Sequence, residues 1–191
     1  VFLTLGPGMA AGLILNGQLY GGAADMAGEV GHIRLAAWGP AGCGKPGSFE
    51  GFCSGAGIAR LARAMVEAEH QRGRRPALCP RPEDLPALTA ELVGRAAQGG
   101  DPLALRVFDE VARRLGQGLA ILIDTLNPEA VVIGSIYGRQ LALLEAGVAE
   151  VLREECLPQT LAACRVVPAG LGEAVGDYAA LAVARELLRD T

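Results

Sequence analysis

The sequence predicts an α/β fold in which a mixed β-sheet is flanked by helices. Short apolar runs typical of strands open the chain, and helical periodicity then alternates with two further strand-like runs at residues 130–133 and 165–167. The 191 residues suit one domain, and a hydrophobic content of 51% excludes a disordered chain. Only eight residues are aromatic, so the core must be mainly aliphatic.

The beginning of the chain predicts a β-meander. Three antiparallel strands are expected there, at residues 1–5, 12–15 and 18–20. A glycine-rich turn at residues 6–10 joins the first two strands, and Asn16-Gly17 is a typical two-residue hairpin signal for the third. Residues 29–35 are interpreted as a short extended piece. Residues 36–55 are rich in Gly and Pro and are interpreted as a long ordered loop.

Helical periodicity dominates after residue 55. The spacing of apolar residues predicts helices from residue 58 to about 72, and then at residues 83–98, 102–126, 140–155 and 174–188. Asp101-Pro102 supplies an N-cap followed by proline at the first helical position of the longest helix. Gly116 and Gly118 lower the helix propensity within it and allow a neighbour to pack closely.

Charge and cysteine content exclude several classes of protein. A net charge of −4 argues against a nucleic-acid surface, and we interpret the basic knot of Arg72, Arg74 and Arg75 as a solvated helix end. No apolar run approaches the ~18 residues of a membrane span. Five cysteines at irregular spacing and no signal peptide indicate reduced thiols in the cytoplasm.

Two segments of the first third could bind ligands. Glycines at residues 6–12, between two strands, would let backbone N–H groups cradle phosphate oxygens, although an ordinary turn fits the spacing equally well. In Glu29-Val30-Gly31-His32 a carboxylate and an imidazole could converge on one polyhydroxylated ligand. A structural histidine is the alternative interpretation of this motif.

Two further segments are weak signals when taken alone. Residues 39–55 contain Cys43, which has no partner at CxC or CxxC spacing and therefore gives little support for zinc. Gly134-Ser135 follows the strand at residues 130–133, and α/β sheets often admit nucleotides beyond the carboxyl ends of their strands.

Together and in this order, the four segments resemble the ROK family of sugar kinases and transcriptional repressors. The family pattern is a GTGxGxG loop, an AGExGH motif, a zinc segment CxCGxxGCxExxxSG and an NPxxxxxGG strand end. The resemblance spans nearly all of the chain and implies the actin-like ATPase fold, in which two ribonuclease-H-like lobes close on a cleft. Residues 1–191 would form a single carboxyl-terminal lobe, since no segment reads as the DxGxT motif of the amino-terminal lobe.

The resemblance assigns roles to particular residues. Sugar hydroxyls would be bound by Glu29, His32 and Glu50, and the nucleotide would be lined by Gly6, Gly8, Gly134 and Ser135. The catalytic aspartate would belong to the amino-terminal lobe, so we expect no catalytic residue here and no phosphorylation by this chain alone. ATP and Mg²⁺ would serve the complete protein.

The chain also departs from the family pattern. Ala41 and Ser48 stand where the zinc segment has cysteines, and Cys43 with His32 cannot close a tetrahedral site, so no zinc is expected. The loop would be held by the packing of Phe49 and Phe52. In the phosphate-binding motifs, the residues that replace Thr, Gly and Gly are Pro7, Ala10 and Ser135, which should weaken nucleotide binding.

The leading hypothesis is therefore the carboxyl-terminal lobe of a cytoplasmic ROK hexose kinase. The alternative is a sugar-sensing ROK transcriptional regulator without its DNA-binding domain, and a degenerate structural or dimerisation module is a third. The expected partners are a hexose-type sugar and ATP, with a homodimer open, and this lobe is expected to contact neither nucleic acid nor a membrane.

Overall fold

A four-stranded mixed sheet anchors the fold. The computed structural model describes residues 1–174 and Tyr178. The sheet has the order β2-β1-β7-β8, and its strands are β1 (Phe2–Leu5), β2 (Met9–Gly12), β7 (Ala130–Ile133) and β8 (Arg165–Pro168). β1 runs antiparallel to β2 and parallel to β7, and β7 runs parallel to β8. The α/β class and the mixed sheet predicted from the sequence are confirmed.

The helix α4 (Pro102–Leu126) forms the centre of the core. Asp101 is its N-cap, since one carboxylate oxygen accepts hydrogen bonds from the backbone of Leu103 and Ala104, both at 2.9 Å. The helix ends at Asn127, whose φ of 44° is the left-handed conformation of many helix ends. Both expected ends of this helix are therefore confirmed, and its apolar face lies buried in the core.

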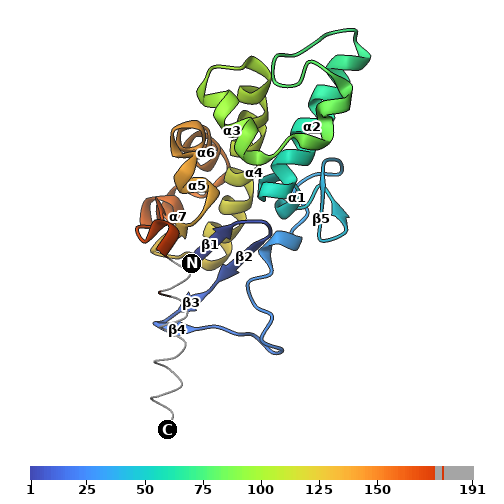
Figure 1. Cartoon of the computed structure of the whole chain (residues 1–191). Coiled ribbons are helices and arrows are strands. Elements are labelled where there is room, and N and C mark those ends of the chain that lie inside the picture. The colour runs from blue at the N-terminus through green and yellow to red at the C-terminus, as the bar shows by residue number, and fades with distance from the viewer. Residues whose placement is uncertain (175–177, 179–191) are drawn as a thin grey trace.

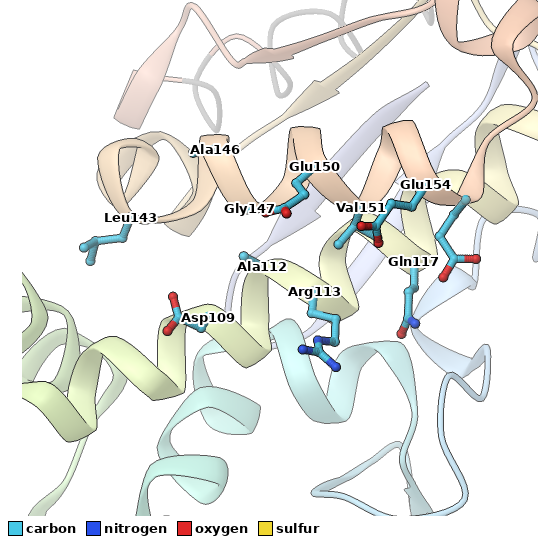
Figure 2. A pocket seen from close by; sticks show the side chains of 11 residues that line it. Asp109, Ala112, Arg113, Gln117, Leu143, Ala146, Gly147, Glu150, Val151 and Glu154 are labelled. Carbon is cyan, nitrogen blue, oxygen red and sulfur yellow. The ribbon is translucent and has the colours of Figure 1, made fainter.

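Three helices follow β7 in sequence: α5 (Ile136–Arg139), α6 (Leu141–Glu155) and α7 (Pro158–Ala163). Figure 2 shows α6 lying along α4, with Gly147 facing Ala112. A groove of about 540 Å³ lies between the two helices. This α4–α6 groove is lined by four carboxylates and one cation, namely Asp109, Glu150, Glu154, Glu155 and Arg113. It contains none of the site residues predicted from the sequence.

Two of the helices that precede α4 in sequence begin at buried serines. α1 (Phe49–Cys53) and α2 (Gly55–Gln71) are each capped by a buried serine, Ser48 and Ser54 respectively. Phe49 is fully buried because α4 carries glycine at position 118, where a Cβ would overlap the phenyl ring. The close packing expected of this glycine is thus confirmed. The carboxyl end of α2 lies on the opposite side of the molecule from β3 and β4 (Figure 1).

The amino-terminal meander differs from the expectation. β3 (Ile14–Leu15) and β4 (Gln18–Leu19) pair around the predicted Asn16-Gly17 turn, but they form a separate two-stranded sheet. The ladder between β1 and β2 ends at Gly12, and Leu13 is buried before the chain turns outward into the hairpin. The expected second strand at residues 12–15 is therefore wrong, because β1 pairs with Met9–Gly12, which includes part of the predicted turn. The expected third strand is wrong as a member of the main sheet.

Three other segments also differ. Val30–His32 is a 3₁₀ turn rather than an extended piece. The supposed loop at residues 36–55 contains a small hairpin, β5 (Ala41–Gly42) and β6 (Lys45–Pro46), followed by α1. The helix expected at residues 83–98 is divided into a 3₁₀ helix, Pro82–Ala87, and α3 (Ala90–Gln98), because Pro86 has no N–H to donate and Thr89 caps a new helix.

Two short elements were not anticipated, namely α5 and α7, and a final 3₁₀ turn covers Gly172–Ala174. The helix expected at residues 174–188 lies, apart from Ala174 and Tyr178, outside the described residues. No helix of the described part has both the length and the apolar character needed to cross a membrane.

Candidate functional site

Glu50, in the first turn of α1, connects three separate segments. Its carboxylate accepts hydrogen bonds from the backbone N–H groups of Met9 at 3.1 Å and Cys43 at 3.0 Å, and from the Cys43 thiol at 3.1 Å. Gly8 also lies close to this carboxylate, since a Cβ atom added to Gly8 would be 3.2 Å from Glu50 Oε2. The glycine turn, the β5–β6 hairpin and α1 therefore meet at one side chain.

Glu29 and His32 flank the two buried residues of the 3₁₀ turn, and both are exposed. Gly31 between them is buried, and a Cβ at this position would lie 2.7 Å from the Met9 carbonyl oxygen and 3.2 Å from the Glu50 Cβ. Only glycine allows the turn to approach β2 and α1 so closely. Lys45 secures the turn by donating from Nζ to the His32 carbonyl oxygen at 2.7 Å.

The charged groups around Cys43 are Glu50, Glu29 and Lys45. The hydrogen bond to Glu50 is the main cause that raises the pKa of the Cys43 thiol, followed by slight burial and by the negative charges of Glu50 and Glu29. The thiol therefore stays protonated near neutral pH and acts as a donor. We call Glu29, His32, Cys43, Lys45 and Glu50 the carboxylate–histidine cluster.

His32 is exposed, and its imidazole makes no hydrogen bond to any residue in the part of the chain that the structure describes. The alternative of a structural core histidine is therefore wrong. Glu29 is exposed as well, while Glu50 is half-buried. The cluster thus presents two carboxylates and one imidazole to solvent, which is a set of groups that accept and donate hydrogen bonds to hydroxyls.

A second site adjoins the cluster on the other side of the glycine turn. A cavity of about 730 Å³ is lined by Gly6 and Pro7, by the first turns of α2 and α3, and by Ser135, Arg139 and Gln140. We call it the glycine-loop pocket. Gly6 and Ser135 are brought together there as predicted, but Gly8 and Gly134 do not line the pocket. Gly8 faces Glu50, and Gly134 is buried against the Phe2 ring.

Arg63 shapes a wall of this pocket. Its guanidinium donates to the carbonyl oxygens of Leu85, Pro86 and Leu88, at 3.1, 3.2 and 2.6 Å, and so fixes the chain before α3. Neither Arg63 nor Arg139 was identified from the sequence. Arg139 follows Ser135 by four residues, a spacing that becomes informative only if a helix is recognised at residues 136–139.

The glycine turn offers few donors to a ligand. Among the backbone nitrogens of residues 6–9, that of Gly6 donates to the Gly8 carbonyl oxygen at 3.0 Å, that of Met9 donates to Glu50, and Pro7 carries no hydrogen. The N–H of Gly8 is the one of the four that bonds to no described residue. The loss of donors expected from the Pro7 replacement is therefore visible in the geometry.

Ser135 occupies a conformation that suits glycine. Its φ of 62° and ψ of −116° lie outside the regions that side chains favour, at a cost of about 1–3 kcal/mol. Arg139 donates from Nη2 to its hydroxyl at 3.2 Å. Ser135 therefore adopts the backbone conformation suited to the glycine of the family pattern, and its side chain makes that conformation strained.

The loop that resembles a zinc segment does not fit zinc. Ser48 is fully buried, and its hydroxyl accepts from Gly42 N at 3.2 Å and Gly51 N at 3.1 Å while donating to the Gly42 carbonyl oxygen at 3.1 Å. The Cys43 thiol is directed to Glu50 instead. Within residues 1–174 and Tyr178, no group of three or more His, Cys, Asp or Glu could hold a metal ion.

Aromatic packing completes the loop. Phe49 and Phe52 are both fully buried, as expected. The guanidinium of Arg114 lies 4.8 Å from the Phe52 ring centroid and 5.4 Å from that of Trp38, which allows cation–π contacts with both rings. The sequence did not indicate the roles of Ser48, Trp38 and Arg114, because their partners come from other segments.

The fold is of the actin-like ATPase class. The family model described as ROK family matches residues 1–186, and the chain belongs to this family. The resemblance noted in the sequence is thereby confirmed.

Three relatives illustrate the similarity. Glucokinase of Halalkalibacterium halodurans is 40% identical over 136 residues, which are 70% of this chain and 40% of the relative. The transcriptional dual regulator NagC of Escherichia coli is 33% identical over 141 residues, or 73% of this chain and 32% of the regulator. A crystal structure of a ROK family glucokinase from Streptomyces griseus, in complex with glucose and AMPPNP, matches with a TM-score of 0.72 and 28% identity over 92% of this chain and 56% of that one.

The chain therefore spans well under two thirds of the length of these relatives, which include both kinases and DNA-binding regulators.

Proposed function

We propose that this chain is the sugar- and nucleotide-binding lobe of an ATP-dependent ROK hexose kinase. One observation carries the proposal. The glycine turn separates the two sites, with Gly8 against the Glu50 carboxylate and Gly6 on the wall of the glycine-loop pocket. A sugar hydroxyl at the cluster and a phosphate at the turn would thus lie on opposite sides of the same few residues.

In this proposal the carboxylate–histidine cluster binds the sugar. Glu29 and Glu50 accept hydrogen bonds from hydroxyls, and the neutral imidazole of His32 accepts one and donates one. The two backbone N–H groups on Glu50 fix its carboxylate before a ligand arrives, which limits the entropy lost on binding.

The glycine-loop pocket would take the nucleotide, with Gly6 and Ser135 near the phosphates and Gly134 supporting the strand end. ATP supplies the phosphoryl group that is transferred to the sugar. We assign no residue of this chain to Mg²⁺ and none as the base that deprotonates the sugar hydroxyl. Phosphorylation by residues 1–191 alone is therefore not expected.

Calorimetry with glucose tests the sugar site. Glucose should bind saturably to the 191-residue protein, and Glu29→Gln should weaken this binding at least tenfold because one acceptor of hydroxyl hydrogen bonds is lost. Glu67→Gln is a matched control, since Glu67 is an exposed carboxylate on α2 away from both sites. Unchanged affinity in the Glu29 variant would refute the assignment, as would the absence of glucose binding to the wild type.

A sugar-sensing regulator is the second candidate, and the single free N–H of the glycine turn favours it. A sensor needs the sugar site but has no use for phosphate contacts. AMPPNP titration in the presence of glucose separates the two functions. Saturable binding that depends on the glycine-loop pocket supports the kinase, whereas glucose binding without detectable AMPPNP binding supports the regulator.

A further inference from the structure

The basic knot at the end of α2 is more than a solvated helix end. Glu69 is buried there, with its side chain 8% exposed, and it forms ion pairs with Arg74 at 2.9 Å, Arg72 at 3.0 Å and Arg106 of α4 at 3.3 Å. One carboxylate thus pairs with arginines from the carboxyl end of α2 and from the first turns of α4. The hydrogen bond from Arg74 is the main cause that lowers the pKa of Glu69, so this group stays ionised at neutral pH.

A cavity of about 360 Å³ opens beside these arginines. Its charged lining residues are Glu69, Arg74, Arg75, Asp101 and Arg106, and Pro76, Ala77, Pro102 and Leu103 form an apolar wall. We call it the arginine pocket. Arg75 makes no ion pair with any residue of the described part of the chain. The lining carries three arginines and two carboxylates, a net charge of +1, and Arg72, which pairs with Glu69 from outside the lining, raises the local net charge to +2.

The neighbouring backbone adds to the positive potential. The pocket includes the first residues of α4, a helix of 25 residues whose amino-terminal end carries the positive pole of its dipole. Glu69 engages one nitrogen of each of its three arginines, so the other guanidinium donors are held in place and available. The arrangement is organised before any ligand binds.

We propose that the arginine pocket binds a phosphate monoester dianion. Guanidinium groups bind phosphate oxygens in pairs, and a charge of −2 matches the excess positive charge of the site. The apolar wall would contact the organic part of a phosphorylated compound. The α4–α6 groove has the opposite character, since its four carboxylates around Arg113 would repel the same ligand (Figure 2).

The site is distinct from the glycine-loop pocket. On α2, the glycine-loop pocket is lined by residues up to Arg63, and the arginine pocket is lined by Glu69. At ~1.5 Å per residue these two residues are separated by roughly 9 Å along the helix, and the two pockets share no lining residue. The proposal is therefore independent of the proposed kinase activity.

Calorimetry at low ionic strength with inorganic phosphate, glucose 6-phosphate and glucose tests this site. Arg75→Gln is the main variant, because Arg75 holds no ion pair and its loss should leave the melting temperature unchanged. Arg106→Gln is the second, and Arg113→Gln, an exposed arginine on the same helix, is the control. We expect saturable phosphate binding that weakens about tenfold in each of the first two variants and is unaltered in the control.

The two phosphate probes distinguish the source of the ligand. Tighter binding of glucose 6-phosphate than of inorganic phosphate indicates an organic phosphate that uses the apolar wall, and equal binding indicates free phosphate. The glucose arm reports on the carboxylate–histidine cluster and should not respond to Arg75→Gln. The proposal is overturned if phosphate does not bind saturably, or if its binding persists unchanged in both Arg75→Gln and Arg106→Gln.

Discussion

The two sides of the glycine turn are held by different means. On the side of the carboxylate–histidine cluster, Glu50 and Ser48 each receive hydrogen bonds from several backbone groups, and Gly31 is packed without free space. On the side of the glycine-loop pocket, Pro7 provides no donor and Ser135 is strained. Side-chain hydrogen bonds therefore fix the residues around the cluster, whereas the pocket side depends on a backbone that Pro7 and Ser135 have altered.

Gly31→Ala should have the largest effect on this contrast. The new Cβ would press on the Met9 carbonyl oxygen, so we expect a loss of about 3 kcal/mol in the free energy of unfolding together with loss of glucose binding. Urea denaturation and calorimetry measure the two effects. Gly170→Ala is the control, because no atom lies within 4 Å of a Cβ there. A stable Gly31→Ala variant that binds glucose normally would contradict the packing described.

Ser48→Ala should come next. It removes the hydroxyl that satisfies Gly42 N, Gly51 N and the Gly42 carbonyl oxygen in a fully buried place, at a cost of about 2 kcal/mol. Thr89→Ala, which removes an exposed helix cap, should cost about 1 kcal/mol and is the comparison. Equal losses in the two variants would show that the buried network does not stabilise the loop.

Ser135→Gly tests the side of the glycine-loop pocket, where the backbone of Ser135 is strained. Relief of the strained φ should raise the free energy of unfolding by about 1 kcal/mol, although the hydrogen bond from Arg139 is lost. AMPPNP affinity should rise and glucose affinity should stay constant. The same change to glycine at an unstrained loop residue, Ala169→Gly, is the control and should lower the free energy of unfolding slightly. A destabilised Ser135→Gly protein would mean that the serine hydroxyl outweighs the strain.

Pro7→Thr should leave stability nearly unchanged and strengthen AMPPNP binding by about fivefold, since one hydrogen bond is worth about 1 kcal/mol. The threonine restores a backbone N–H and a hydroxyl beside Gly8. Pro46→Thr, in the β5–β6 hairpin, is the control and should not change AMPPNP affinity. If AMPPNP affinity does not rise in the Pro7→Thr variant, the phosphates do not bind at the glycine turn.

The smallest effect concerns the Cys43 thiol. The pKa of the Cys43 thiol is raised in the folded state, so the protonated thiol stabilises the folded protein slightly at pH values below the ordinary thiol pKa. This stabilisation is lost as the pH rises through the raised pKa of the folded state. Alkylation of Cys43 should therefore be slow at pH 8 and faster in Glu50→Gln, which weakens the acceptor. Mass spectrometry separates Cys43 from the other four cysteines, of which three are buried.

Local signals predicted much of the fold. The boundaries of α4 follow from Asp101-Pro102 and Asn127, and the apolar run of β7 follows from its composition, because each depends on neighbouring residues. One error had a local cause, since Pro86 and Thr89 divide the helix expected at residues 83–98. Other errors occurred where a distant partner decided the conformation. Residues 30–32 form a 3₁₀ turn because Gly31 packs on Met9 and Glu50, which no local pattern reveals.

The candidate site shows the same limit. The order of the motifs indicated Glu29, His32, Glu50, Gly6 and Ser135 as binding residues, and these roles stay predictions. Glu29 and Glu50 lie near Cys43, Gly6 and Ser135 line the glycine-loop pocket, and the exposed His32 ends the 3₁₀ turn that follows Glu29. Arg63 and Ser48 were missed because their partners lie on other segments. The resemblance to a family motif also placed Gly8 at the nucleotide, while the structure has it facing Glu50.

The position of β1 in the sheet has a consequence for how the protein folds. β1 is an interior strand whose neighbour β7 comes late in the sequence, so that Phe2 pairs with Val132. Until that partner is synthesised, one edge of the β1–β2 hairpin exposes unpaired backbone groups and can associate with other chains. Such distant pairing also slows folding. Ribosome-bound intermediates shorter than about residue 135 should therefore be the ones that depend on chaperones.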